Sequence, residues 1–197
     1  MNFLAHLYLS GDNPDLQIGN FIADFIKANR FTHLPLPIQE GIFLHRHIDT
    51  FTDAHPVVKQ SKRRLHKRYR HYNGIIIDIF YDHFLAKNWH NYHTVSLEDY
   101  SKTFYTLLQN NKTILPLSVT RFMTYLIKEN WLLNYAGFQG IEKTLIGMNK
   151  RTKNISQMHL AIADLKLHYT DFESDFTSFF ENLRTFSAEK INTITNS

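Results

Sequence analysis

Cysteine is absent from the 197 residues of this chain. Disulfides, thiolate nucleophiles and cysteine-ligated zinc are therefore excluded, and any bound metal must be held by histidine, aspartate or glutamate. Glycine and proline are scarce, with 7 and 5 residues, whereas 43% of the residues are hydrophobic and 14% are aromatic. Such a composition favours a compact, mostly helical chain over a disordered or turn-rich one.

Long apolar runs are also missing. No uninterrupted stretch approaches the roughly 20 apolar residues that a membrane-spanning helix needs. The apolar opening stretch, residues 1–9, is short and has neither a basic leader nor a small-residue cleavage pattern. We therefore expect no signal peptide, no membrane span and a cytoplasmic location. The length fits one domain, a helical bundle over residues 1–197 with a frayed tail from about residue 187.

Acidic residues are absent from residue 54 to residue 77, although the whole chain carries a formal charge of only +4. The segment's seven cations, here called the basic strip, are Lys59, Lys62, Arg63, Arg64, Lys67, Arg68 and Arg70. We expect most of the strip on a helix at 57–72, where it would attract a polyanionic partner. A merely solvated helix face is the alternative. Tyr69 and Tyr72 alternate with arginines, but no nucleic-acid-binding motif accompanies them, which makes nucleic acid an unlikely partner.

The stretch from Gly41 to Asp53 carries the most informative pattern. At about 100° per residue, His45 and Asp49 lie on one stripe of a helix, beside a stripe of apolar residues, with Arg46 on the flank. A histidine and an aspartate four residues apart are close enough to hold one cation or to hydrogen-bond each other. The alternative is an amphipathic helix whose polar side happens to contain these residues.

A narrow polar stripe also marks the segment from residue 12 to residue 28, which we expect to be helical. Its members are Gln17, Asn20, Asp24 and Lys27. This stripe is either the solvent edge of a mostly buried helix or a polar line that faces inward. Asp24 fits both interpretations equally.

A third informative helix is predicted at 75–90. On the helical projection, Asp78 and Asp82 point to the interior, whereas His83 points toward solvent or the rim of a site. Buried carboxylates must be paired, hydrogen-bonded or bound to metal, and a structural salt bridge or cap is the alternative to a metal role. Further helices are predicted at 96–111, 119–130, 141–151 and 156–186, the last with a possible break near residue 168.

Histidines and aspartates from separate helices can converge in the core of a bundle. The candidates are His6, Asp24, His45, Asp49, Asp53, Asp78, Asp82 and His83. Without cysteine, such a set suits Mn²⁺ or Mg²⁺, with Fe²⁺ or Zn²⁺ as further possibilities. A centre of this kind favours hydrolysis of phosphate esters, and Arg46, if it turns inward, could hold a phosphate.

Several motifs in order resemble one family. They are Met1-Asn2-Phe3-Leu4-Ala5-His6-Leu7, Gly19-Asn20-Phe21-Ile22-Ala23-Asp24-Phe25, Gly41-Ile42 with His45-Arg46 and Ile48-Asp49, Thr52-Asp53, Asp82-His83-Phe84-Leu85 with Trp89, and Gly147-Met148 before Arg151. Through nearly its whole length the chain resembles the acyl carrier protein phosphodiesterases. The resemblance implies an all-α fold related to the HD-type phosphohydrolases. It also implies Mn²⁺-stimulated removal of 4′-phosphopantetheine from the serine of holo-acyl carrier protein.

On this resemblance we assign roles as a hypothesis. The metal ligands are Asp24, His45, Asp49 and Asp82; Arg46 steadies the phosphate; His6 or His83 protonates the leaving serine oxygen; and Asp53 and Asp78 orient the ligands. Acyl carrier proteins are small and strongly acidic, so the basic strip is expected to bind one. At His47 the resemblance departs from a family pattern that has a second arginine there, so no role of that arginine is carried over.

Two other functions remain open at this point. The metal site could hydrolyse another small phosphodiester or a nucleotide. Alternatively, the chain could be a non-catalytic docking module for an acidic protein or nucleic acid, in which case binding would survive removal of metal.

Overall fold

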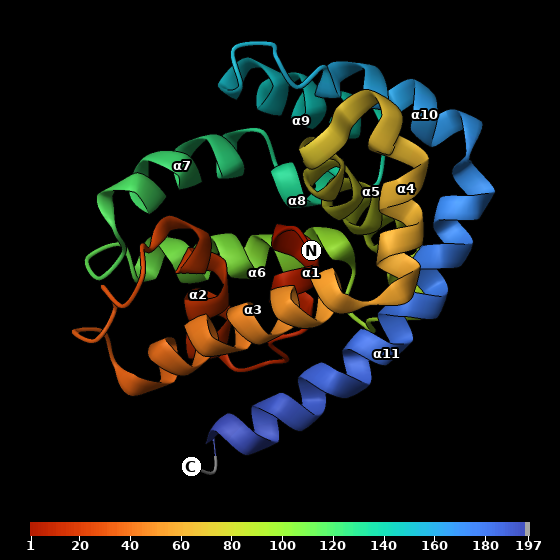
Figure 1. Ribbon diagram of the computed structural model, residues 1–197. Coiled ribbons are helices and arrows are strands. Elements are labelled where there is room, and N and C mark those ends of the chain that lie inside the picture. The colour runs from red at the N-terminus through yellow and green to blue at the C-terminus, as the bar shows by residue number, and fades with distance from the viewer. Residues whose placement is uncertain (196–197) are drawn as a thin grey trace.

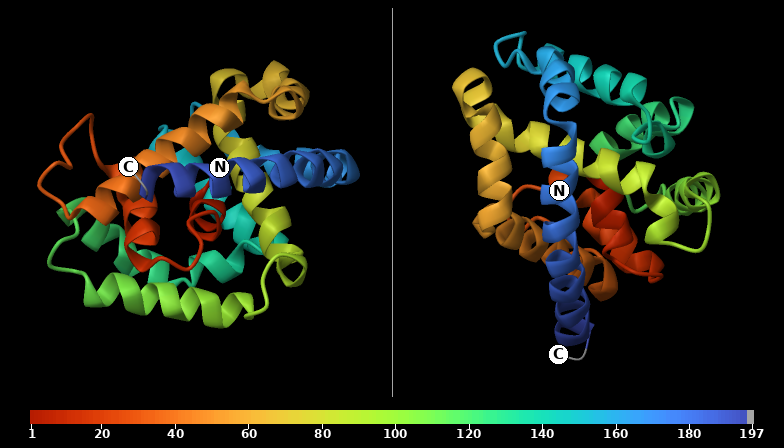
Figure 2. Two further views of the ribbon diagram at one scale, coloured as in Figure 1. Left: turned by 90° about the horizontal axis from the view of Figure 1, so that it is seen from below. Right: turned by 90° about the vertical axis from the view of Figure 1, so that its right-hand side faces the viewer.

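A computed structural model describes residues 1–195, and all of its regular elements are helices, with no strand in this range. The first helix, α1 (Phe3–Tyr8), is only six residues long and packs against α2 (Pro14–Ile22) and α5 (Asn73–Lys87). The N-terminus lies near the middle of the molecule in all three views (Figure 1 and Figure 2). The expected all-α class is confirmed.

Helix α2 starts at a strong cap and crosses α3 (Leu36–Ala54) very closely. The Asn13 side chain accepts hydrogen bonds from two backbone N–H groups of the first turn, and proline follows it at the first helical position. Where the helices cross, a Cβ on Gly19 would lie 2.0 Å from the Ile38 carbonyl oxygen, and one on Gly41 would lie 2.5 Å from the Leu16 oxygen. Only glycine permits this approach.

The predicted helix at 57–72 is α4 (Pro56–Tyr69) followed by the short 3₁₀ helix η2 (Arg70–Tyr72). The helix at 75–90 is α5 followed by the 3₁₀ helix η3 (Trp89–Asn91). Unlike α4, helix α5 is buried on nearly all sides of its second half, where even Asp82 and His83 are removed from solvent. It is therefore the central helix, and no face of its second half is exposed to solvent.

The remaining helices enclose this centre. They are α6 (Leu97–Asn110), α7 (Leu117–Lys128), α8 (Trp131–Asn134), α9 (Phe138–Arg151), η4 (Met158–Leu160), α10 (Ala161–Leu167) and α11 (Tyr169–Thr195), with the 3₁₀ helix η1 (Ala23–Phe25) after α2. The expected break near residue 168 is present between α10 and α11. The prediction of a frayed tail from about residue 187 is wrong up to Thr195, because α11 continues to that residue. Residues 196–197 of that tail lie outside the described part of the chain.

Helix α11 runs along one side of the molecule toward the C-terminus and crosses the whole height of the side view (Figure 1 and Figure 2). It packs against α3, α4 and α5 through four fully buried phenylalanines. These are Phe172, Phe176, Phe179 and Phe180. Burying each such side chain stabilises the fold by about 1.5–3 kcal/mol, so this stripe holds α11 in place.

In the described residues, no helix combines the length and apolar character needed to cross a bilayer.

Candidate metal centre

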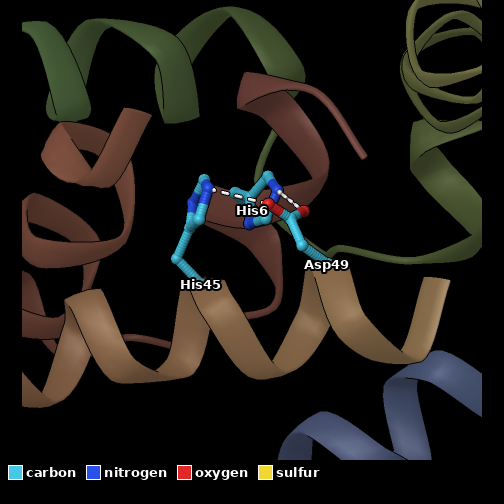
Figure 3. Close-up of side chains that lie close together, drawn as sticks. All are labelled: His6, His45 and Asp49. Carbon is cyan, nitrogen blue, oxygen red and sulfur yellow. Dashed lines mark ion pairs between the residues drawn. The ribbon is translucent and has the colours of Figure 1, made fainter. Parts of the chain in front are cut away.

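Two histidines and one aspartate converge beside the central helix. His6 comes from α1, whereas His45 and Asp49 lie one turn apart on α3, and one potential ligand atom from each falls within 4.8 Å of the others (Figure 3). The Asp49 carboxylate reaches both imidazoles, at 3.2 Å from His6 Nε2 and 3.1 Å from His45 Nε2. The two rings stack with their centroids 4.0 Å apart. The predicted pairing of His45 with Asp49 on one helix face is confirmed by this geometry.

Asp24 lies at the edge of the same cluster. Its Oδ1 is 3.3 Å from His45 Nε2, the same ring nitrogen that Asp49 contacts. The residue belongs to the 3₁₀ turn η1, because the α-helical pattern of α2 ends at Ile22 rather than at residue 28. Of the four ligands predicted from the sequence, His45 and Asp49 therefore belong to the cluster, and Asp24 contacts it through His45.

Asn20 fixes the orientation of His45. The His45 Nδ1 is 2.9 Å from the Asn20 carbonyl oxygen and 3.0 Å from its Oδ1, so Nδ1–H donates there and Nε2 faces the carboxylates. The Asn20 amide also donates to the His6 carbonyl oxygen at 2.9 Å, which ties α1 to the same arrangement. Asn20 is fully buried, so the polar stripe of α2 faces inward at this residue. Its role was not predicted, although its place in that stripe was the available signal.

The two histidines differ in protonation. Burial, together with the neighbouring His45, lowers the pKa of His6 to about 4. Burial also lowers the pKa of His45, but hydrogen bonds to Asp24 and Asp49 outweigh this effect and raise it to about 9. Burial would raise the pKa of Asp49, yet the two imidazoles hold it well below its ordinary value. His6 is thus a neutral imidazole, the form that binds metal, whereas His45 would have to release its Nε2 proton to bind one.

The donor set fits a divalent cation. His6 is 2% exposed, and neither of its ring nitrogens makes a hydrogen bond, although Nε2 lies near Asp49. A buried imidazole without a hydrogen-bond partner is uncommon unless a further group completes its environment. Two imidazole nitrogens and carboxylate oxygens, without sulfur, are ligands that Mn²⁺, Fe²⁺ and Zn²⁺ accept. His6, His45 and Asp49, with Asp24 beside them, could therefore hold such an ion.

A cavity of about 410 Å³ opens in front of this cluster. Its walls include Asp24 and Asp49 on one side and Trp131, Tyr135 and Arg151 on another. This volume falls in the range of about 300–1,000 Å³ that is typical of small-molecule sites. The arrangement can hold a phosphate-containing group next to a metal site.

Asp53 and Asp78 line the same cavity without touching the imidazoles. Asp53 pairs with Lys62 of α4 at 2.7 Å. Asp78 Oδ1 lies 3.1 Å from the Met1 α-amino group, which is itself 3.8 Å from Asp49. Burial raises the pKa of Asp78, although the amino group opposes this effect. The orienting role predicted for both residues stays a prediction.

Asp82 is not part of the cluster. It is 0% exposed, and its two oxygens accept hydrogen bonds from the backbone N–H groups of Leu4 at 2.8 Å and Ala5 at 3.2 Å. These are orphan donors of the first turn of α1, so the carboxylate acts as a cap supplied by another helix. Burial raises the pKa of Asp82 to about 7, which these hydrogen bonds only partly offset. The inward direction was predicted correctly, but the structure gives the side chain a capping position rather than a ligand position.

His83 and Arg46 also lie away from the cavity walls. His83 is buried, with Nδ1 2.8 Å from the Tyr135 carbonyl oxygen and Nε2 3.0 Å from the Tyr169 hydroxyl. The predicted solvent-facing position is wrong because α5 is covered on that side too. Arg46 donates to the Ala28 carbonyl oxygen and lies 4.9 Å from the Phe31 ring centroid. The structure therefore brings neither residue to the cluster.

The basic strip divides into two groups. Lys62, Arg64 and Arg68 form ion pairs within the fold, with Asp53, Asp175 and Asp164 respectively. The other four cations are exposed and form no ion pair with any described residue. They are Lys59, Arg63, Lys67 and Arg70. Spacings of four residues place Lys59, Arg63 and Lys67 along one face of α4, whereas Arg70 follows the end of that helix. Part of the strip therefore carries uncompensated charge.

Comparison with known proteins shows the family of this chain. The family model described as acyl carrier protein phosphodiesterase matches residues 1–183. The chain belongs to the acyl carrier protein phosphodiesterase family. A relative of that name from Photorhabdus laumondii is 33% identical over 181 residues, which cover 91% of each chain. Relatives of that name from Salmonella dublin and Salmonella agona are each 33% identical over 195 residues, covering 96% of this chain and 99% of theirs. No solved structure matches. Membership identifies the chain as one of a family of enzymes, whereas the relation to HD-type folds stays a prediction.

Proposed function

We propose that this protein is a metal-dependent phosphodiesterase that removes 4′-phosphopantetheine from the serine of holo-acyl carrier protein. The observation that carries the proposal is the convergence of His6, His45 and Asp49, because Asp49 also lines a cavity of about 410 Å³. The family to which the chain belongs supplies the substrate. The product besides 4′-phosphopantetheine is the apo-carrier protein.

His6, His45 and Asp49 would hold the ion, with Asp24 as a further carboxylate and Mn²⁺ as the preferred metal. When bound, a divalent ion lowers the pKa of a water molecule bound to it and stabilises negative charge on phosphoryl oxygens. Asn20 keeps Nε2 of His45 directed at the site by accepting a hydrogen bond from Nδ1–H. This support is present before any ligand arrives, because Asn20 is fully buried.

Arg151 takes the phosphate contact that the sequence had suggested for Arg46. It lines the cavity and makes no ion pair with any residue from 1 to 195, and its guanidinium donates a hydrogen bond to Met148 Sδ at 3.7 Å. A guanidinium without an ion pair among residues 1–195, on the wall of a cavity whose other charged side chains are aspartates, suits a phosphodiester, because its planar fork donates to two oxygens at once.

Hydrolysis must also move a proton. A water oxygen bonds to phosphorus, the bond from phosphorus to the serine oxygen breaks, and that oxygen takes a proton. Asp78 lies in the same cavity and its pKa is raised by burial, so it is the cavity carboxyl best suited to carry this proton. The phosphate stays on the pantetheine arm.

The unpaired face of the basic strip would bind the acidic carrier protein. Lys59, Arg63 and Lys67 are exposed on α4, and the neighbouring Lys62 contacts Asp53 at the cavity wall. A protein bound along α4 would therefore present its modified serine near the site. Charge complementarity of this kind mainly raises the rate of encounter.

Mass spectrometry of holo-acyl carrier protein incubated with the enzyme tests the proposal. With Mn²⁺ the carrier should lose the mass of phosphopantetheine, and with a chelator it should not. His45→Ala and Asp49→Asn should abolish the loss, whereas Glu142→Gln on the exposed side of α9 should not. A carrier mass that stays unchanged with the wild-type enzyme and Mn²⁺ would refute the assigned reaction.

A further inference from the structure

A second, smaller cavity adjoins the candidate metal centre. It has a volume of about 160 Å³, lies between α8 and α9, and has mostly apolar walls. Pockets that enclose a whole drug-sized ligand are typically about 300–1,000 Å³. A space of this size therefore suits one segment of a longer molecule whose remainder lies elsewhere.

The two cavities share one wall. Trp131, Thr144, Met148 and Arg151 line both of them. The three residues from α9 follow at intervals of four and three, so they form a single ridge along that helix. Trp131 Nε1 donates to Thr144 Oγ1 at 3.0 Å, which fixes α8 against the ridge. A molecule whose anionic group lies beside Arg151 can thus extend over this ridge into the apolar space.

Gly147 keeps this space open. It lies inside the 14-residue helix α9, where glycine costs about 1 kcal/mol relative to alanine. The fold does not require glycine there, because an added Cβ would meet no atom within 4 Å. Gly140 on the same helix is different, since its Cβ would lie 1.9 Å from the Asn134 carbonyl oxygen. Packing therefore explains Gly140, whereas Gly147 leaves room in the cavity that it lines.

We propose that the small cavity is the subsite for the pantetheine arm of the substrate. This inference rests on the proposed function. The arm is an uncharged chain of methylene and amide groups attached to the phosphate. A position that binds an anion, followed by a narrow apolar cavity, therefore matches the order of these groups along the substrate. Neither a second, free phosphate ion nor an acidic peptide would account for an apolar cavity at this position.

Binding measurements test the subsite without turnover. Titration calorimetry with Mn²⁺ present should show that the wild-type enzyme binds 4′-phosphopantetheine about tenfold more tightly than inorganic phosphate. Such a gain corresponds to roughly two buried methylene groups. Gly147→Phe should remove this difference while leaving the affinity for phosphate unchanged. Glu142→Phe, which places the same ring on the exposed side of α9, should bind both ligands as the wild type does.

Two results would overturn the inference. One is a wild-type enzyme that binds 4′-phosphopantetheine no more tightly than phosphate, a measurement that needs no variant. The other is a folded Gly147→Phe enzyme that retains the wild-type preference. If the wild-type enzyme releases phosphopantetheine from holo-carrier protein while either result holds, only the subsite is wrong. If it releases none, the proposed function itself fails.

Discussion

Asp82→Ala separates a structural cap from a metal ligand. The substitution leaves the buried N–H groups of Leu4 and Ala5 without their acceptors at 2.8 and 3.2 Å. Hydrogen bonds to a charged group contribute about 1.5–3 kcal/mol each, and the cost of burying the carboxylate favours the lower figure. We therefore expect a loss of about 3 kcal/mol in the free energy of unfolding. For a chain of this size that loss corresponds to a fall of about 6–12 °C in Tm.

Thermal unfolding followed by circular dichroism, with and without Mn²⁺, provides the assay. At pH 8, above the raised pKa of Asp82, the metal-free variant should unfold at a lower temperature than the wild type. Saturating Mn²⁺ should still raise its Tm, because a ligand that binds only the folded state stabilises it. Asp49→Ala is the matched control, and Mn²⁺ should not raise its Tm. An Asp82→Ala variant with the wild-type Tm and no response to Mn²⁺ would refute the capping role.

Three further predictions concern the support of the site. Asn20→Ala should weaken Mn²⁺ binding by about 10–100-fold in calorimetry, because the residue orients His45; unchanged affinity would contradict this. Gly41→Ala should destabilise the fold by about 1–3 kcal/mol in urea unfolding, since its Cβ would lie 2.5 Å from a backbone oxygen, whereas Gly147→Ala should not. Lys59→Glu with Arg63→Glu should reduce kcat/KM for holo-carrier protein but not for bis(p-nitrophenyl) phosphate; equal losses would exclude a docking role.

The part of the site that could be predicted from the sequence lies within single helices. His45 and Asp49 are four residues apart, and one turn of any α-helix places such residues together regardless of its neighbours. The inward direction of Asp82 followed from the same projection. The bounds of α6 and α9 also agree with the predicted ranges to within a few residues, since their apolar periodicity is strong.

The rest of the site depends on contacts between helices, and the apolar periodicity of a single helix does not encode these contacts. The projection points His83 toward solvent or the rim of a site, but α5 is buried around its second half, so polar residues there have no solvent to face. Asp82 could be recognised as a cap only once the first turn of α1 was seen to lie against it. Arg151 entered the sequence analysis only as part of the motif after Gly147-Met148, with no role attached, because an exposed arginine near the end of a helix is ordinary and only the fold brings it to the cavity wall.

The position of His6 links the cap to the chemistry. Helix α1 has six residues, and an isolated helix of that length is unstable in water, since nucleation is not repaid by so few hydrogen bonds. Asp82 accepts hydrogen bonds from two N–H groups in the first turn of α1. Asn20 accepts a hydrogen bond from His45 Nδ1–H and donates one to the His6 carbonyl oxygen. A group that never touches the metal can therefore decide whether one ligand is in place. For that reason Asp82→Ala should weaken Mn²⁺ binding less than Asp49→Ala does, and more at temperatures close to its own Tm.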